Sequence, residues 1–87
     1  MQPDDRDIAF LWDILEAAND VHDFVKNINL QKFSSDKKTR YAVEQQLLVI
    51  GEAAKRISES YKQKHAEIPW KRMVGLRNIL AHEYGEI

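Results

Sequence analysis

The stretch that decides the fold runs from Asp36 to Lys64 and reads DKKTRYAVEQQLLVIGEAAKRISESYKQK. Its apolar residues recur at three- and four-residue intervals, as Val43, Leu47, Ile50, Ala54, Ile57 and Tyr61. This spacing places them on one face of an α-helix and is typical of the seam of an antiparallel bundle. Ser34 or Ser35 can cap its start. We therefore expect one helix over residues 36–64, in which Gly51 lets another backbone approach closely.

Another helix is expected upstream, from about Asp4 to Asn27, and residues 28–34 read as the connection between the two. The apolar residues of this upstream helix form two adjoining stripes, Phe10, Ile14, Ala17, Val21 and Phe24 in one, and Ile8, Leu11, Leu15, Ala18 and Val25 in the other. A helix that is apolar over so wide an arc must bury it against more than one neighbour. In a short chain, we expect part of that surface to meet a second subunit.

A third helix is expected from Pro69, which suits a first helical turn, to about His82 or Tyr84. Its apolar stripe is formed by Trp70, Met73, Val74 and Leu80, and Arg77 interrupts that stripe. Such a local violation often marks function. Alternatively, the stem of the arginine packs while its head reaches solvent or a carboxylate. The three segments together predict an all-α fold, an antiparallel helical bundle of three helices.

Length and composition limit the possible classes of protein. The 87 residues suffice for one small domain, residues 1–87, with 31% charged and 44% hydrophobic residues and no Cys. Disulfides and thiolate chemistry are thereby excluded. We find no membrane-spanning apolar run and no signal peptide, so a cytoplasmic protein is expected. No Asp, Glu or His cluster has metal-ligand spacing. We therefore expect no metal, and His22 and His65 to be surface or interface residues.

The net charge of −1 conceals an asymmetry along the chain. Residues 1–30 hold seven acids against two bases, whereas residues 55–77 hold seven bases against two acids. The basic end is either a solvated helix face or a surface that binds RNA. Lys71 and Arg72 are the candidate RNA-binding residues.

Residues 77–84 read RNILAHEY. This stretch resembles the R-x4-H-x-Y motif of the HEPN superfamily, specifically its HepT branch, in which a polar residue commonly follows the Arg. The residues that match are Arg77, Asn78, His82 and Tyr84. Residues 50–53 (IGEA) and 68–70 (IPW) also look like that branch, so the resemblance covers nearly the whole chain. It implies a HEPN-type bundle, whose usual fourth, C-terminal helix we expect to be missing from this short chain.

The residue types of the motif suit RNA cleavage without a metal. A His that titrates near neutrality can take the proton of the RNA 2′-hydroxyl or give one to the leaving oxygen. The guanidinium of Arg77 can hold the phosphoryl oxygens, and Asn78 can orient the phosphate or His82. On a continuous helix, however, Arg77 and His82 project about 140° apart. The site therefore needs either a distortion near Ala81 or two copies of this helix, and the resemblance implies a dimer with both motifs in one cleft.

The resemblance further implies the toxin of a type VII HEPN/MNT toxin–antitoxin system. Such a toxin is a metal-independent endoribonuclease that needs no cofactor, and tRNA and mRNA are both plausible targets. Its antitoxin is an MNT-type nucleotidyltransferase that transfers AMP from ATP onto Tyr84. Two alternatives stay open: a catalytically silent HEPN module that binds a nucleotidyltransferase partner, and a generic helical dimerisation protein, which would leave Arg77 and the polar cluster unexplained.

Overall fold

A computed structural model, which describes residues 5–75, shows an antiparallel helical hairpin with a shorter helix at each end. The helices are α1 (Asp5–Val25), α2 (Leu30–Ser35), α3 (Lys37–Arg56) and α4 (Glu59–Lys64). A further helical stretch over residues 70–75, here called the Trp70 segment, follows α4. All regular structure within residues 5–75 is helical, which confirms the predicted all-α class.

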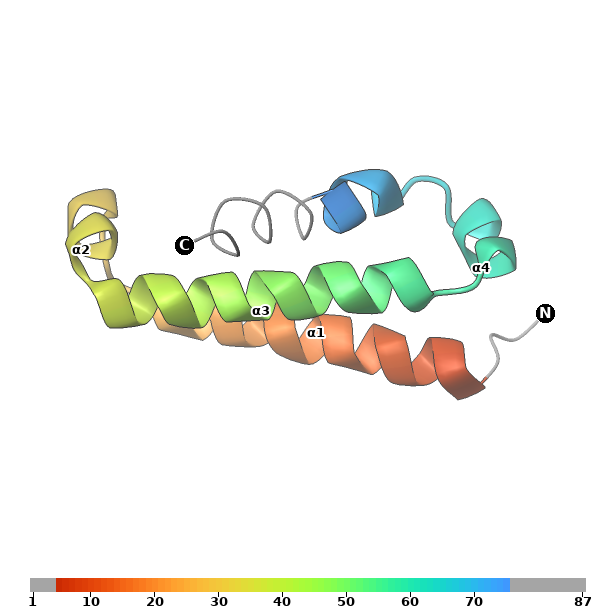
Figure 1. Cartoon of the computed structure of the whole chain (residues 1–87), viewed down its shortest axis with the longest axis horizontal. Coiled ribbons are helices and arrows are strands. Elements are labelled where there is room, and N and C mark those ends of the chain that lie inside the picture. Colours follow the sequence, from red (N-terminus) through yellow and green to blue (C-terminus); the bar gives the residue numbers. More distant parts are fainter. Residues whose placement is uncertain (1–4, 76–87) are drawn as a thin grey trace, which may run out of the picture.

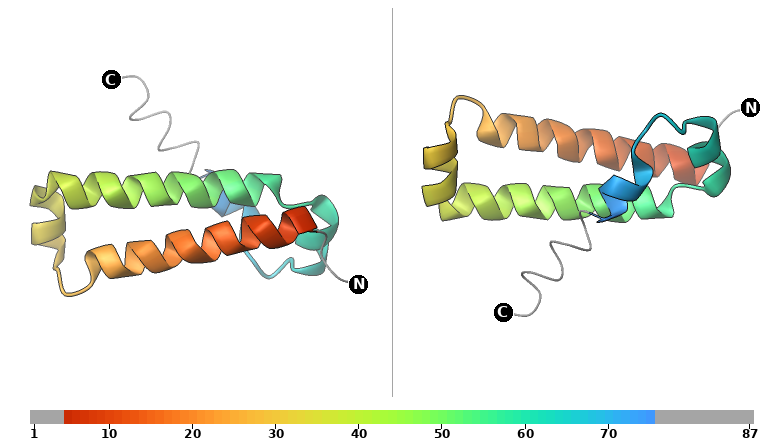
Figure 2. Two further views of the ribbon diagram at one scale, coloured as in Figure 1. Left: turned by 90° about the horizontal axis from the view of Figure 1, so that it is seen from below. Right: turned by 90° about the horizontal axis from the view of Figure 1, so that it is seen from above.

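The two long helices, α1 and α3, lie side by side in opposite directions (Figure 1). α2 connects them at one end of the pair. At the other end, the chain passes through α4 and turns back, so that the Trp70 segment lies over the α1–α3 pair (Figure 2). No helix in residues 5–75 is both long and apolar enough to cross a membrane.

The predicted seam of residues 43–61 does face the core. Val43, Ala54 and Ile57 are buried, and Tyr61 packs against the cluster that Ala54 and Ile57 form with Trp70. This cluster also receives partly buried side chains from α1 and from the Trp70 segment, namely Phe10, Leu11, Ile14, Met73 and Val74. Gly51 is buried on α3, and its role in a close backbone approach stays a prediction.

The expectation of a plain connection over residues 28–34 was wrong, because α2 occupies most of it. Asn29 caps α2, since its Oδ1 accepts a hydrogen bond from the backbone N–H of Lys32 at 2.8 Å. The cap of the next helix is Asp36, not Ser34 or Ser35. Its Oδ1 accepts from the Thr39 N–H at 3.2 Å, and its Oδ2 accepts from the Thr39 hydroxyl at 2.9 Å. These bonds lower the pKa of Asp36 and favour the charged carboxylate that suits a helix N-terminus.

The prediction of one helix over residues 36–64 was also wrong, because α3 ends at Arg56 and α4 begins at Glu59. The physical reason lies in Ser58. Its Oγ accepts from the Tyr61 N–H at 3.2 Å and so caps α4. Asp7 of α1 accepts from both the backbone N–H of Ser58, at 2.8 Å, and its hydroxyl, at 2.6 Å. The Asp7 carboxylate therefore stabilises a non-helical junction between α3 and α4, which the apolar periodicity alone does not predict.

The wide apolar arc of α1 is only partly covered within the monomer. Ala17 is buried, and Phe10, Leu11 and Ile14 pack against the core cluster. In contrast, Ile8, Trp12 and Leu15 are 40%, 64% and 50% exposed. Because they follow one another at four- and three-residue intervals, these three side chains share one face of α1, here called the α1 stripe.

Candidate functional site

The Trp70 segment is held in place by the residue for which it is named. Trp70 is only 8% exposed, and its indole Nε1 donates a hydrogen bond to the carbonyl oxygen of His65 at 3.0 Å. Its ring meets the Tyr61 ring edge-on, with the two centroids 6.1 Å apart. The Met73 N–H bonds to the Pro69 carbonyl oxygen at 3.1 Å, so helical hydrogen bonding begins directly at Pro69. This segment leads the chain towards residue 77, where the predicted motif begins.

The two histidines within residues 5–75 have structural surroundings. His65 stacks on Tyr61, with the ring centroids 4.4 Å apart, and its Nδ1 lies 3.5 Å from a carboxylate oxygen of Glu67. His22 is exposed on α1, and its Nδ1 lies 3.9 Å from the Asp23 carboxylate. Both positions agree with the surface or interface role expected from the sequence.

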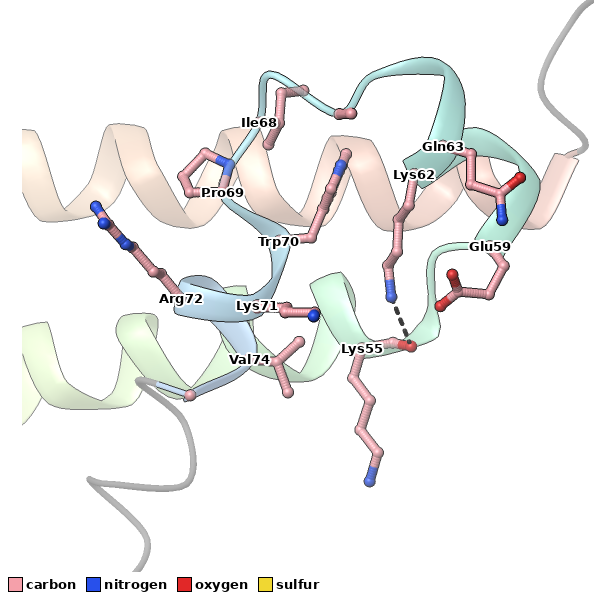
Figure 3. Close-up of a pocket in the computed structure, with 12 residues that line it drawn as sticks. Lys55, Glu59, Lys62, Gln63, Ile68, Pro69, Trp70, Lys71, Arg72 and Val74 are labelled. Carbon is pink, nitrogen blue, oxygen red and sulfur yellow. Dashed lines mark hydrogen bonds between the residues drawn. The ribbon is translucent and has the colours of Figure 1, made fainter.

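A basic groove of about 780 Å³ lies between α4 and the Trp70 segment (Figure 3). Four cations and a single acid are among the residues that line it: Lys55, Lys62, Lys71 and Arg72 against Glu59. The apolar part of the lining comes from Ile68, Pro69, Trp70 and Val74. Both candidate RNA-binding residues, Lys71 and Arg72, therefore lie at this groove. Figure 3 shows that Lys71 points towards the side of Lys62, whereas Arg72 extends away from them.

Lys62 is the most firmly placed cation of the groove. It is half-buried, and its Nζ donates to the carbonyl oxygen of Lys55 at 3.4 Å (Figure 3). That carbonyl belongs to the last turn of α3, where the helix dipole favours a positive charge. An ammonium has three donors, so this bond leaves two for a ligand. Sequence reasoning missed Lys55 and Lys62 as site residues, since their pairing depends on the chain break at Ile57 and Ser58.

A second cavity, of about 450 Å³, lies between α1 and α3 and has a different character. Its charged lining residues are two acids and one base, Asp13, Glu52 and Arg56. Of these two cavities, only the groove beside the Trp70 segment has an excess of positive charge.

Among residues 5–75, Asp7 is the one buried carboxyl group, and it lies near the end of the hairpin that carries α4. It is 3% exposed, and its pKa is lowered below the usual value of 3.8, chiefly because the Ser58 hydroxyl and backbone N–H donate to it. These hydrogen bonds give Asp7 a structural role, because they hold α1 against the junction between α3 and α4. Within residues 5–75, no three His, Asp or Glu side chains are grouped as a metal ion would require.

The motif residues themselves, Arg77, Asn78, His82 and Tyr84, lie outside the described residues. Their predicted roles therefore stay predictions. Leu80 of the expected third apolar stripe lies outside them as well, whereas Trp70, Met73 and Val74 of that stripe pack in the core as predicted.

Comparison with known proteins decides the family. Residues 14–87 match the family model described as "Ribonuclease HepT-like". The chain belongs to the HepT-like ribonuclease family. It is 52% identical over 80 residues to a Methanocaldococcus jannaschii protein named "Putative RNase MJ1380", which covers 91% of this chain and 73% of that protein. It is 43% identical over 75 residues to the "Probable ribonuclease HepT" of Thermococcus cleftensis, which covers 86% of this chain and 68% of that protein.

The HepT-like chain thus spans about two thirds to three quarters of the length of these two relatives. No solved structure matches it. The family model covers residues 77–84, so the predicted motif lies within the matched region. The resemblance to the HepT branch noted from the sequence is confirmed.

Proposed function

We propose that this HepT-like protein is a metal-independent endoribonuclease, the toxin of a HEPN/MNT toxin–antitoxin system, with Arg77, Asn78 and His82 as its catalytic residues. The observation that carries the proposal is the stretch RNILAHEY at residues 77–84, in a chain of the HepT-like ribonuclease family. The basic groove supports it, because its wall, the Trp70 segment, leads directly to the motif.

The proposed reaction is cleavage by the RNA 2′-hydroxyl. This oxygen attacks the adjacent phosphorus and loses its proton, while the bond to the 5′-oxygen breaks and that oxygen gains a proton. His82 serves one of these proton transfers. Arg77 binds the phosphoryl oxygens, on which negative charge accumulates, and Asn78 orients the phosphate or the imidazole.

The test is cleavage of a mixed RNA substrate, tRNA and mRNA, by the purified protein. Arg77→Ala and His82→Ala should each abolish cleavage while the far-UV circular dichroism spectrum and the melting temperature stay close to those of the parent. Lys38→Ala, an exposed residue at the far end of α3, is the matched control and should cleave normally. EDTA should leave activity intact. Loss of cleavage in EDTA, with recovery on adding magnesium or manganese, would contradict metal independence.

We propose that the active form is a homodimer that buries the α1 stripe. Exposed neighbouring apolar side chains such as Ile8, Trp12 and Leu15 mark interaction surfaces on soluble proteins. A dimer also answers the geometric problem of the motif, since Arg77 and His82 diverge by about 140° on one continuous helix. Light scattering at micromolar concentration should give twice the mass of one chain, and a stable monomer would contradict the proposal.

We propose that an MNT-type nucleotidyltransferase neutralises the toxin by attaching AMP to Tyr84. The phosphodiester would bring negative charge and bulk to the site where RNA phosphate binds. Mass spectrometry of the protein after incubation with that partner and ATP tests this directly. The expected product carries added mass in steps of one AMP unit on the C-terminal peptide.

A further inference from the structure

We infer that the basic groove between α4 and the Trp70 segment binds the backbone of the single-stranded RNA next to the scissile phosphate, with Lys62 and Lys71 as its main phosphate contacts. This inference rests on the proposed ribonuclease function and adds to it the path of the substrate and two residues that bind it.

The position of the groove favours the substrate as its occupant. One wall is the Trp70 segment, and the last groove residue, Gly75, precedes Arg77 by only two positions in the sequence. An RNA strand cut at the motif must continue on at least one side of it. The groove offers that continuation a hollow surface rather than a convex helix face.

The charge of the groove also matches a polyanion. Its lining carries four cations and one acid, a net charge of +3 (4 − 1), whereas the cavity between α1 and α3 carries one cation and two acids, a net charge of −1 (1 − 2). The exposed face of α1 adds two further acids, Glu16 and Asp23. Phosphate is thus attracted to the basic groove and repelled from the exposed face of α1 and the cavity between α1 and α3.

The shape and chemistry of the walls favour a single strand. A groove of about 780 Å³ is of the size of a small-molecule site, so a short stretch of one strand fits into it. Ile68, Pro69 and Val74 supply apolar surface for sugars and base faces. Trp70 is buried against Ala54 and Ile57, so it supports the wall from behind and offers no open ring for base stacking. We therefore expect backbone contacts with little sequence preference.

Lys62 and Lys71 are the cations best placed for these contacts. The hydrogen bond to the Lys55 carbonyl orients the Lys62 ammonium across the junction between α3 and α4. Lys71, from the opposite wall, points towards the same side (Figure 3). Because Arg72 extends away from both, its removal should matter less than that of either lysine.

The experiment measures binding of a fluorescein-labelled, single-stranded RNA of mixed sequence over a range of salt concentrations. His82→Ala serves as the background, so that the RNA stays intact. Each phosphate contact on a single strand contributes about 0.7 to the slope of log affinity against log salt. The double variant Lys62→Gln/Lys71→Gln should therefore bind more weakly at low salt and lose about 1.4 from that slope. The Lys62→Arg/Lys71→Arg variant should restore both values.

Lys37→Gln/Lys38→Gln, at the far end of α3, removes the same charge and is the matched control. It should change neither the slope nor the affinity by as much. Equal losses in both double variants would overturn the inference and indicate a general charge effect. An unchanged slope in the groove variant would overturn it too. If the groove variant lost dimerisation but kept RNA binding, the inference would also fail, because the groove would then bind a protein surface.

Cleavage separates this inference from the proposed function. If the groove variant with His82 intact cuts RNA as the parent does, and the same variant in the His82→Ala background binds RNA as that background alone does, the groove inference fails while the ribonuclease function stands. If the parent protein itself neither binds nor cleaves RNA, the proposed function fails, and the inference fails with it.

Discussion

Replacing Trp70 should show how much its buried ring contributes to the stability of the domain. Trp70→Ala removes a buried ring from the cluster with Ala54 and Ile57, a change that costs about 3–5 kcal/mol. At roughly 0.05–0.15 kcal/mol per residue, the whole 87-residue chain has a free energy of unfolding of roughly 4–13 kcal/mol. The variant should therefore lose between about a quarter and all of the free energy of unfolding of the domain.

Trp70→Phe keeps an aromatic ring and removes the indole N–H. The His65 carbonyl loses the bond at 3.0 Å but still accepts from the Ile68 N–H at 3.1 Å, so it is not left unpaired. The expected cost is the bond itself, about 0.5–1.5 kcal/mol, plus a small packing defect.

Urea denaturation followed by circular dichroism checks both values. The midpoint should fall slightly for Trp70→Phe and steeply for Trp70→Ala, with the slope m unchanged for the former. Leu30→Ala is the control, because Leu30 is 79% exposed and lies outside both this core cluster and the α1 stripe. If Trp70→Ala were as stable as the parent, or no less stable than Trp70→Phe, the conclusion that the Trp70 ring holds this segment against the core would be refuted.

Three other predictions concern pH, assembly and control. Asp7 has a folded pKa below its usual 3.8, so its stabilising effect is present above pH 3.8 and is lost as the pH falls through the folded pKa. Asp7→Asn should therefore lower the melting temperature at neutral pH, and the difference from the parent should narrow below pH 3.8. A difference that does not depend on pH would contradict this prediction. Trp12→Ser should weaken the dimer in light scattering, and in a Trp70→Phe background the emission of Trp12 should shift to longer wavelength on dilution; an emission independent of concentration would place Trp12 outside the interface. Tyr84→Phe should keep RNA cleavage but escape inhibition by the nucleotidyltransferase and ATP, and full inhibition of this variant would remove Tyr84 from control.

The long apolar repeats made the main architecture predictable from the sequence. The seam of residues 43–61 and the apolar residues of α1 follow the helical period, so an antiparallel pair that buries part of each was a direct consequence. In the predicted stripe from Phe10 to Phe24, Phe24 is the residue that the structure leaves exposed, at 39%, because it lies in the last turn of α1.

The helix ends were less predictable, because they depend on single polar contacts. Ser58 reads as one more polar residue in a helical run, and only the Asp7 carboxylate, 51 positions earlier, explains why the chain breaks there. Asn29 and Asp36 cap their helices through local bonds, which the sequence permits but does not distinguish from the nearby serines.

The candidate site divides in the same way. The motif at residues 77–84 could be found because its residue types and spacing are specific. The groove could not, since it forms only when the break before α4 places Lys62 opposite Lys71. The excess of bases over residues 55–77 indicated a polarity of charge, but not which of these residues share a cavity.

The bond between Asp7 and Ser58 also bears on the order in which the molecule folds and opens. At one end, the α1–α3 hairpin is closed by the short chain through α2, so zipping from that end requires only small loops. Asp7 and Ser58 lie at the opposite end and meet last. Opening should begin there too, and α4 and the adjoining groove would loosen with it. The exchange rate of the Ser58 amide hydrogen, which is held by Asp7 at 2.8 Å, therefore measures how often the end of the hairpin that carries the basic groove opens.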